Sequence, residues 1–151
     1  MNWRVRYCSI LLVVVALVSC VFGLIYCFIP RPMPYHLQFI GVSLEEIGDF
    51  NPRLAQWVMF LIRIVGICFL SIGVLVIGIA LKAFRRSERW AWVTVFPAAM
   101  VVIIPLTTIT FYTGEAVKWV MTGLLVLSLI AMFLPIKDFF RRMGSGLDIK
   151  T

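Results

Sequence analysis

Four long apolar stretches constrain the fold of this chain more than any other feature of its sequence. They cover Tyr7–Ile29, Trp57–Leu81, Trp90–Tyr112 and Lys118–Ile136. A helix needs about 20 residues to cross about 30 Å of hydrocarbon, and helices satisfy their own backbone hydrogen bonds in lipid. Hydrophobic residues make up 62 % of the chain, against roughly 45–50 % in soluble domains. The sequence therefore predicts an all-α polytopic membrane protein, folded as one four-helix transmembrane bundle over residues 1–151.

The basic residues indicate how this bundle is oriented. Most of them belong to the N-terminus, the inner loop 82–89 and the tail 137–151, namely Arg4, Arg6, Lys82, Arg85, Arg86, Arg89, Lys137, Arg141, Arg142 and Lys150. The opposite side carries Arg31, Arg53 and Lys118. Because basic loops stay in the cytoplasm, we expect a multi-pass protein of the cell membrane with both its N-terminus and its C-terminus cytoplasmic.

Tryptophans at the ends of the spans are predicted interface anchors. Trp90 and Trp92 belong to the inner side, and Trp57 and Trp119 to the outer side, as in the aromatic belts of membrane proteins. The inner basic residues would bind anionic lipid headgroups. No nucleic-acid partner is expected, because the chain has no basic surface of domain size.

The outer loop, residues 30–56, is predicted to contain a short amphipathic helix. Ser43 and Glu46 have the spacing of a capping box, and Gly48 is expected to end the helix. Its apolar face would lie on the membrane surface and consists of Leu44, Ile47 and Phe50. The acidic residues of this loop could instead line a mouth for a cation or substrate.

The second span carries the clearest packing pattern. Asn51 is a predicted N-cap, with Pro52 at the first helical position. Gly66, Gly73 and Ala80 recur every seven residues, and such small residues let another helix approach closely. They are the predicted helix-packing residues.

Arg63 is the sharpest candidate for a functional residue, because a charged side chain within a span is costly unless it is paired or reaches water. It precedes Gly66 by three residues, so we expect it near the packed face, directed into the bundle or toward its outer mouth. The candidate intramembrane polar site combines Arg63 with Thr107, Thr108 and Glu115. Arg63 could lock the outer loops onto the helices, or it could bind an anion or a lipid headgroup.

The third span contains Pro97 and Pro105, each of which removes one backbone hydrogen bond. The carbonyls of Val93 and Val101 are then free near a kink, and threonine hydroxyls, water or Arg63 could satisfy them. Broken helices with polar groups at depth are typical of transporters, although the chain shows no symmetry between its halves.

The first span raises a question of processing. Leu17–Cys20 resembles the lipobox of bacterial lipoprotein signal peptides, but the apolar run continues to Ile29, which favours a retained helix. The four cysteines contain no C-x-x-C pair, and the chain has one histidine. We therefore predict no metal site and no cofactor.

Part of the chain resembles small four-helix membrane proteins of prokaryotes of the DoxX-like kind. The resemblance is carried by the segment Arg85–Trp92 together with Asn51-Pro52, Arg63, Gly66 and Gly73. The resemblance covers about residues 41–92. It implies a helical bundle and supplies no catalytic residues.

Three classes of function remain. The sequence favours a non-enzymatic accessory or interaction module that associates with a membrane-protein partner or with itself. The alternative is a small oligomeric transporter or channel that carries an anionic or small solute with the help of Arg63. An enzyme acting on a lipid or quinone is disfavoured, because no paired acids, metal triad or nucleophile–base pair share one membrane depth.

Overall fold

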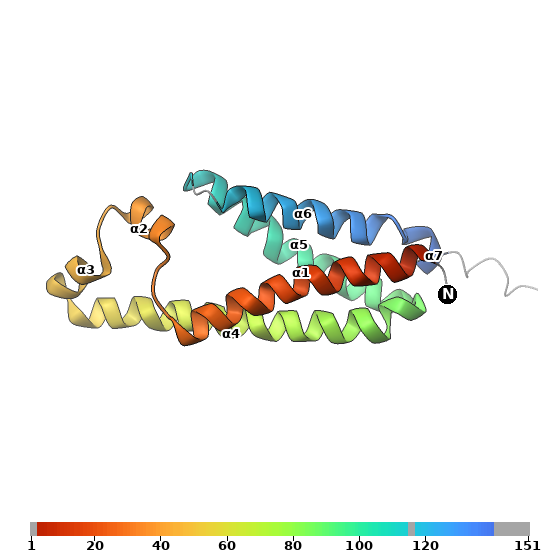
Figure 1. The fold of residues 1–151 in the computed structure, drawn as a ribbon, viewed down its shortest axis with the longest axis horizontal. Helices are drawn as coiled ribbons and strands as arrows, with labels where there is room; N and C mark the ends of the chain where they lie inside the picture. Colours follow the sequence, from red (N-terminus) through yellow and green to blue (C-terminus); the bar gives the residue numbers. More distant parts are fainter. Residues whose placement is uncertain (1–2, 115–116, 141–151) are drawn as a thin grey trace, which may run out of the picture.

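The computed structural model describes residues 3–114 and 117–140, and this part of the chain is all-helical. The all-α class is thereby confirmed, and four helices are long and apolar enough to cross a membrane, in agreement with the four predicted spans. The long helices are α1 (Trp3–Phe28), α4 (Pro52–Lys82), α5 (Arg89–Tyr112) and α6 (Lys118–Phe133). They run lengthwise beside one another in Figure 1. After Pro135 a short α7, Ile136–Phe140, extends the last span.

Two short helices form the connection between α1 and α4. The capping box of α3 (Leu44–Phe50) is confirmed: the Ser43 hydroxyl accepts from the Glu46 N–H at 3.1 Å, and the Glu46 carboxylate accepts from the Ser43 N–H at 2.6 Å. These bonds lower the pKa of Glu46. The prediction that Gly48 ends this helix is wrong. Gly48 lacks the positive φ of a C-cap, and α3 continues to Phe50, where the Asn51 N–H donates to the Ile47 carbonyl.

A further helix, α2 (Pro34–Ile40), was not predicted from the sequence. Its signals were present, because proline suits the first turn of a helix and glycine suits the residue after its end. Pro34 opens the helix and Gly41, with φ of 78°, closes it. These seven residues were too short to show a helical period.

The helix α4 begins as predicted. The Asn51 side chain accepts hydrogen bonds from the N–H groups of Arg53 and Leu54, and Pro52 occupies the first turn. With 31 residues the helix is about 46 Å long, whereas the hydrocarbon is about 30 Å thick. Figure 1 shows its N-terminal part extending beyond α1, beside α3.

The close pair of α1 and α4 is the best-packed part of the bundle. A Cβ atom on Gly66 would lie 2.8 Å from the Tyr26 Cβ and 2.9 Å from the Gly23 carbonyl oxygen. Gly73 lies just as close to Ala16 and Cys20. Small residues on α4 therefore let the two backbones meet.

Two serines of α1 add hydrogen bonds to this pair. The Ser9 hydroxyl donates to the Ala80 carbonyl at 2.7 Å, and the Ser19 hydroxyl donates to the Phe69 carbonyl at 3.1 Å. The bonds lie on both sides of the Gly73 contact and fix the register of the two helices.

The buried core gathers at the end of the bundle where the inner loop turns. This loop forms a short 3-10 helix, Phe84–Arg86, and Phe84 is fully buried, with its ring centroid 4.6 Å from that of Phe139. The core residues come from the start of α1 and α5 and the end of α4 and α6, and they include Val5, Cys8, Leu12, Ala80, Ala83, Ala91, Val95, Ala131 and Met132. All four long helices are therefore tied together at this end.

The replacement Gly66→Ala should destabilise the bundle by about 1–3 kcal/mol, as overpacking does, because the atoms that the new methyl group meets include main-chain atoms of α1. The matched control is Gly78→Ala on the same helix, where a Cβ would meet nothing within 4 Å. The control should be neutral or stabilising by up to about 1 kcal/mol. Unfolding in detergent, followed by circular dichroism, measures both, and equal effects would contradict the packing described.

Candidate functional site: an apolar cavity and the intramembrane polar residues

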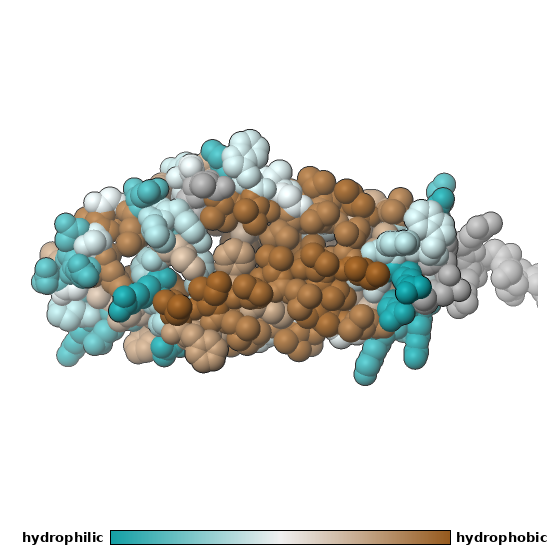
Figure 2. Space-filling model, viewed as in Figure 1, coloured by the Kyte–Doolittle hydropathy of each residue, from teal (hydrophilic) through white to brown (hydrophobic). Residues whose placement is uncertain are grey.

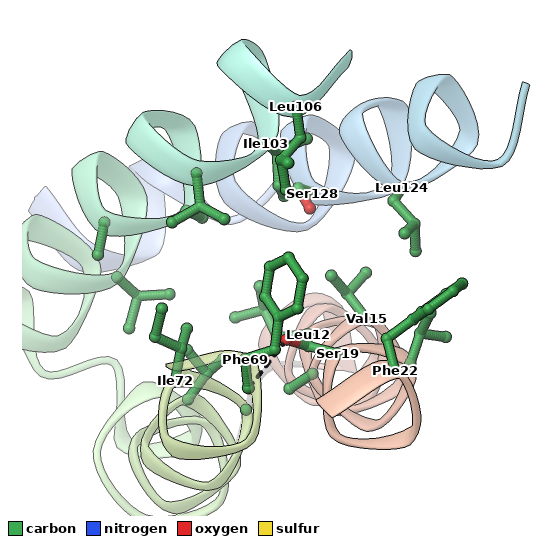
Figure 3. Close-up of a pocket in the computed structure, with 18 of the residues that line it drawn as sticks. Leu12, Val15, Ser19, Phe22, Phe69, Ile72, Ile103, Leu106, Leu124 and Ser128 are labelled. Carbon is green, nitrogen blue, oxygen red and sulfur yellow. Dashed lines mark hydrogen bonds between the residues drawn. The ribbon is translucent and has the colours of Figure 1, made fainter. Parts of the chain in front are cut away.

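A cavity of about 110 Å³ lies between the α1–α4 pair and the α5–α6 pair. Figure 3 shows side chains from both pairs directed into it. Its walls are almost wholly apolar and include Leu12, Phe22, Phe69, Ile72, Ile103 and Leu124. The cavity lies next to the buried core. The two helix pairs meet at the end of the bundle that contains the core, and they leave space between them toward the middle.

Two hydroxyl groups line this cavity. The Ser19 hydroxyl is engaged with the Phe69 carbonyl. Ser128 of α6 is fully buried, and its Oγ has no hydrogen-bond partner among the described residues. Figure 3 shows this oxygen turned toward the space between the helix pairs. A buried polar group without a partner is rare in folded proteins and calls for an explanation.

Sequence reasoning gave Ser128 no role, because single serines are common in membrane helices. Only the position of the side chain against the cavity, together with the missing hydrogen bond, sets it apart.

Arg63 does not point into the bundle, which was one of the two orientations expected from the sequence; the other, toward the outer mouth, stays a prediction. The side chain is exposed, lines neither of the two cavities, and makes no ion pair or hydrogen bond with another described residue. The expectation that it is directed into the bundle is therefore wrong. Glu115, its expected acidic partner, lies outside the described residues.

Two physical reasons explain the exposure of Arg63. At 3.6 residues per turn it lies about 80° around the helix from the mean direction of Gly66, Gly73 and Ala80. It also lies one turn beyond Gly66, whose neighbours are Tyr26 and Cys27. Because α1 ends at Phe28, no turn of that helix remains to cover Arg63.

The threonines of α5 bond to their own helix. The Thr107 and Thr108 hydroxyls donate to the carbonyls of Ile103 and Ile104, at 2.8 Å and 2.9 Å. Neither hydroxyl reaches Val101, so the expected partnership between threonines and the carbonyl freed by Pro105 does not form. Arg63, Thr107 and Thr108 thus do not make one polar site.

A second, wider cavity of about 460 Å³ lies under α2. Its lining comes from α2, α4 and α5 and includes His36, Phe39, Val58, Leu61 and Ile109. It is mainly apolar and shares only Leu106 with the first cavity.

The tryptophans fall into two groups. Trp57, Trp90 and Trp119 are exposed, as side chains in contact with lipid would be. Trp92 is half-buried and its indole N–H donates to the Met132 carbonyl at 2.9 Å. That carbonyl belongs to the last turn of α6, where carbonyls lack partners within the helix, so Trp92 joins α5 to α6.

The described residues contain no group of three histidine, cysteine or acidic side chains that could hold a metal ion. Comparisons of the chain with protein-family models, with curated proteins and with solved structures give no match.

The replacement Ser128→Ala should stabilise the bundle in detergent by about 1 kcal/mol, because it removes a buried hydroxyl that has no partner. Ser9→Ala is the matched control. It should destabilise, because it breaks the 2.7 Å bond to Ala80. Melting temperatures of the two variants give the comparison, and a lowered value for Ser128→Ala would show that its hydroxyl is bonded within the protein.

Proposed function

We propose that the protein is a non-enzymatic module of the cell membrane that associates with a different membrane protein through one face of α4. The observation that carries this proposal is a continuous exposed stripe on that helix, which we call the α4 docking face. It consists of Arg63, Ile67, Ser71, Val74 and Gly78, all of them exposed. Their spacing of four, four, three and four residues keeps them within about 80° of the helix circumference.

Small residues on this face favour a helix as the partner. A Cβ on Gly78 would meet nothing within 4 Å, and Ser71 one heptad earlier is also exposed. Glycine and serine are enriched where membrane helices approach each other closely and form interhelical hydrogen bonds. The equivalent small residues on the other side of α4 already serve this purpose against α1.

Arg63 supports a partner that carries an acidic group near the outer interface. It lies 19 residues before Lys82, a rise of about 29 Å, so the two cations fit the two edges of a hydrocarbon layer about 30 Å thick. A guanidinium at such an edge, unpaired among the described residues, forms its strongest bonds with a carboxylate or phosphate, because its planar fork binds both oxygens.

The same charge argues against a second copy of this chain as the partner. Two copies in one membrane have the same orientation, and a symmetric dimer presents the same patch from both subunits. Contact through the α4 docking face would then bring Arg63 close to Arg63 at one depth. Like charges brought this close repel, and at a protein surface they do so more strongly than in bulk water. A different chain with an aspartate or glutamate therefore fits better.

The transporter alternative receives no support from the cavities. Arg63 lines neither of them, and the walls of the central one are apolar. A path for an anion or other polar solute needs hydrogen-bonding groups along its length. The cavity under α2 has three polar lining residues, His36, Thr110 and Thr113, in a mainly apolar wall.

The surface chemistry favours the membrane placement expected from the sequence. Figure 2 shows hydrophobic side chains gathered over the middle of the molecule and hydrophilic ones toward both ends. The end that carries Arg85 and Arg86 would face anionic headgroups in the cytoplasm. At the other end α3 would lie on the outer membrane surface, with the exposed ring of Phe50 inserted among lipids.

Reporter fusions test this orientation. Fusions at the N-terminus, beside Ser87 and at Gly146 should all report the cytoplasm, because the inner loop and both termini carry most of the basic charge. A fusion beside Gly41, in the outer loop, provides the contrast. An external signal from the Ser87 fusion would overturn the topology.

Affinity purification in mild detergent tests the partnership. The wild-type chain should recover a stoichiometric second membrane protein, and Gly78→Leu should lose it, because the bulky side chain keeps the two helices apart. Gly123→Leu is the matched control, since Gly123 of α6 is also exposed with nothing within 4 Å of an added Cβ. This control should retain the partner.

Replacing Arg63 tests the charge. Arg63→Gln should raise the dissociation constant by about 3- to 20-fold, which corresponds to one interhelical bond of about 0.6–1.7 kcal/mol. The dissociation constant of Arg63→Lys should lie between those of the wild type and of Arg63→Gln, because lysine keeps the charge without the planar fork. A partner that survives Gly78→Leu, or recovery of the chain alone or only as a self-associated oligomer, would refute the proposal.

A further inference from the structure

We propose that the cavity between the two helix pairs binds a neutral, lipid-soluble molecule with an apolar body and one carbonyl or hydroxyl oxygen, which forms a hydrogen bond with Ser128 Oγ. The inference goes beyond the proposed function and does not depend on it. It rests on the shape of the cavity, the state of one hydroxyl group and the depth at which that group lies.

The cavity suits an apolar occupant. Its walls are apolar apart from two serines, and one of these already donates to a backbone carbonyl. A buried water needs two to four polar partners, and an apolar cavity of about 150 Å³ stays dry and accepts benzene. At about 110 Å³ this space fits a ring edge or a short chain segment rather than a whole lipid.

Ser128 behaves unlike three threonines of α5 and α6 that bond to their own helix. A serine or threonine inside a helix usually donates to the carbonyl four residues earlier. Thr107, Thr108 and Thr122 all do so, at 2.8 to 2.9 Å. Ser128 does not, although it is fully buried. Its hydroxyl is therefore available both to donate to a ligand carbonyl and to accept from a ligand hydroxyl.

The depth of Ser128 narrows the class of ligand. It follows Lys118, the outer end of α6, by ten residues, a rise of about 15 Å or half of the hydrocarbon thickness. Phospholipid headgroups and their linkages lie outside the hydrocarbon core. An oxygen that reaches Ser128 must therefore belong to a molecule that dissolves in the core itself, such as a neutral ketone or a long-chain alcohol.

A matched pair of probes tests the proposal with the intact chain in detergent. Nonane and 5-nonanone have the same chain length and differ by one central carbonyl. The wild-type protein should bind 5-nonanone at least about threefold more tightly than nonane. This is the change in the dissociation constant that one weak hydrogen bond in a membrane protein produces. A shift of the ¹³C carbonyl resonance of labelled 5-nonanone would report the hydrogen bond directly.

Two variants and a control decide the outcome. Ser128→Ala should bind both probes equally and abolish the carbonyl shift, and Ala99→Phe, which fills the cavity, should bind neither. Thr94→Ala, an exposed hydroxyl residue of α5 outside both the cavity and the α4 docking face, should behave as the wild type. Equal binding of the two probes by the wild type, a ketone preference that persists in Ser128→Ala, or no binding at all would overturn the proposal.

Discussion

The backbone contact between α1 and α4 is the interaction on which the rest of the bundle depends. In lipid, helices gain no hydrophobic energy by meeting, so close packing and interhelical hydrogen bonds hold them together. Gly23 and Gly66 bring the two backbones within reach of each other, and Ser9 and Ser19 donate across the pair. The described residues of the second pair make no comparable glycine contact. A hydrogen bond from Trp92 to the Met132 carbonyl and an edge-on contact between the Phe96 and Phe133 rings join α5 to α6.

The arrangement of the pairs explains why the protein contains a cavity. Phe84 and Phe139 fill the inner end, where all four long helices contribute to one core. Large apolar side chains of this kind fix the pairs at one end only. Toward the middle, the two pairs pack less closely and a cavity remains between them. The hydroxyl oxygen of Ser128 is buried there without a hydrogen-bond partner among the described residues. The cavity is thus a consequence of where the bulky residues lie.

Much of the fold could be predicted because its determinants are local. Span length, the Ser43 and Asn51 caps and the seven-residue spacing of Gly66, Gly73 and Ala80 are all read along one helix at a time. The direction of Arg63 could not be predicted in the same way. It depends on where a different helix, α1, ends relative to α4. Ser128 is a similar case, because its missing bond and its place in the cavity are properties of the packed helices.

The α4 docking face is separate from the face of α4 that packs against α1 and from the residues of α4 that line the cavity. The mean direction of the α4 docking face lies about 120° around the helix from that of Gly66, Gly73 and Ala80. The residues of α4 that line the cavity between the helix pairs are not among those of the docking face; they are Phe69, Ile72, Gly73 and Val76. A partner helix on the α4 docking face would therefore leave the contact with α1 intact. A ligand in the cavity would contact all four long helices, so α4 is the element that the two sites share.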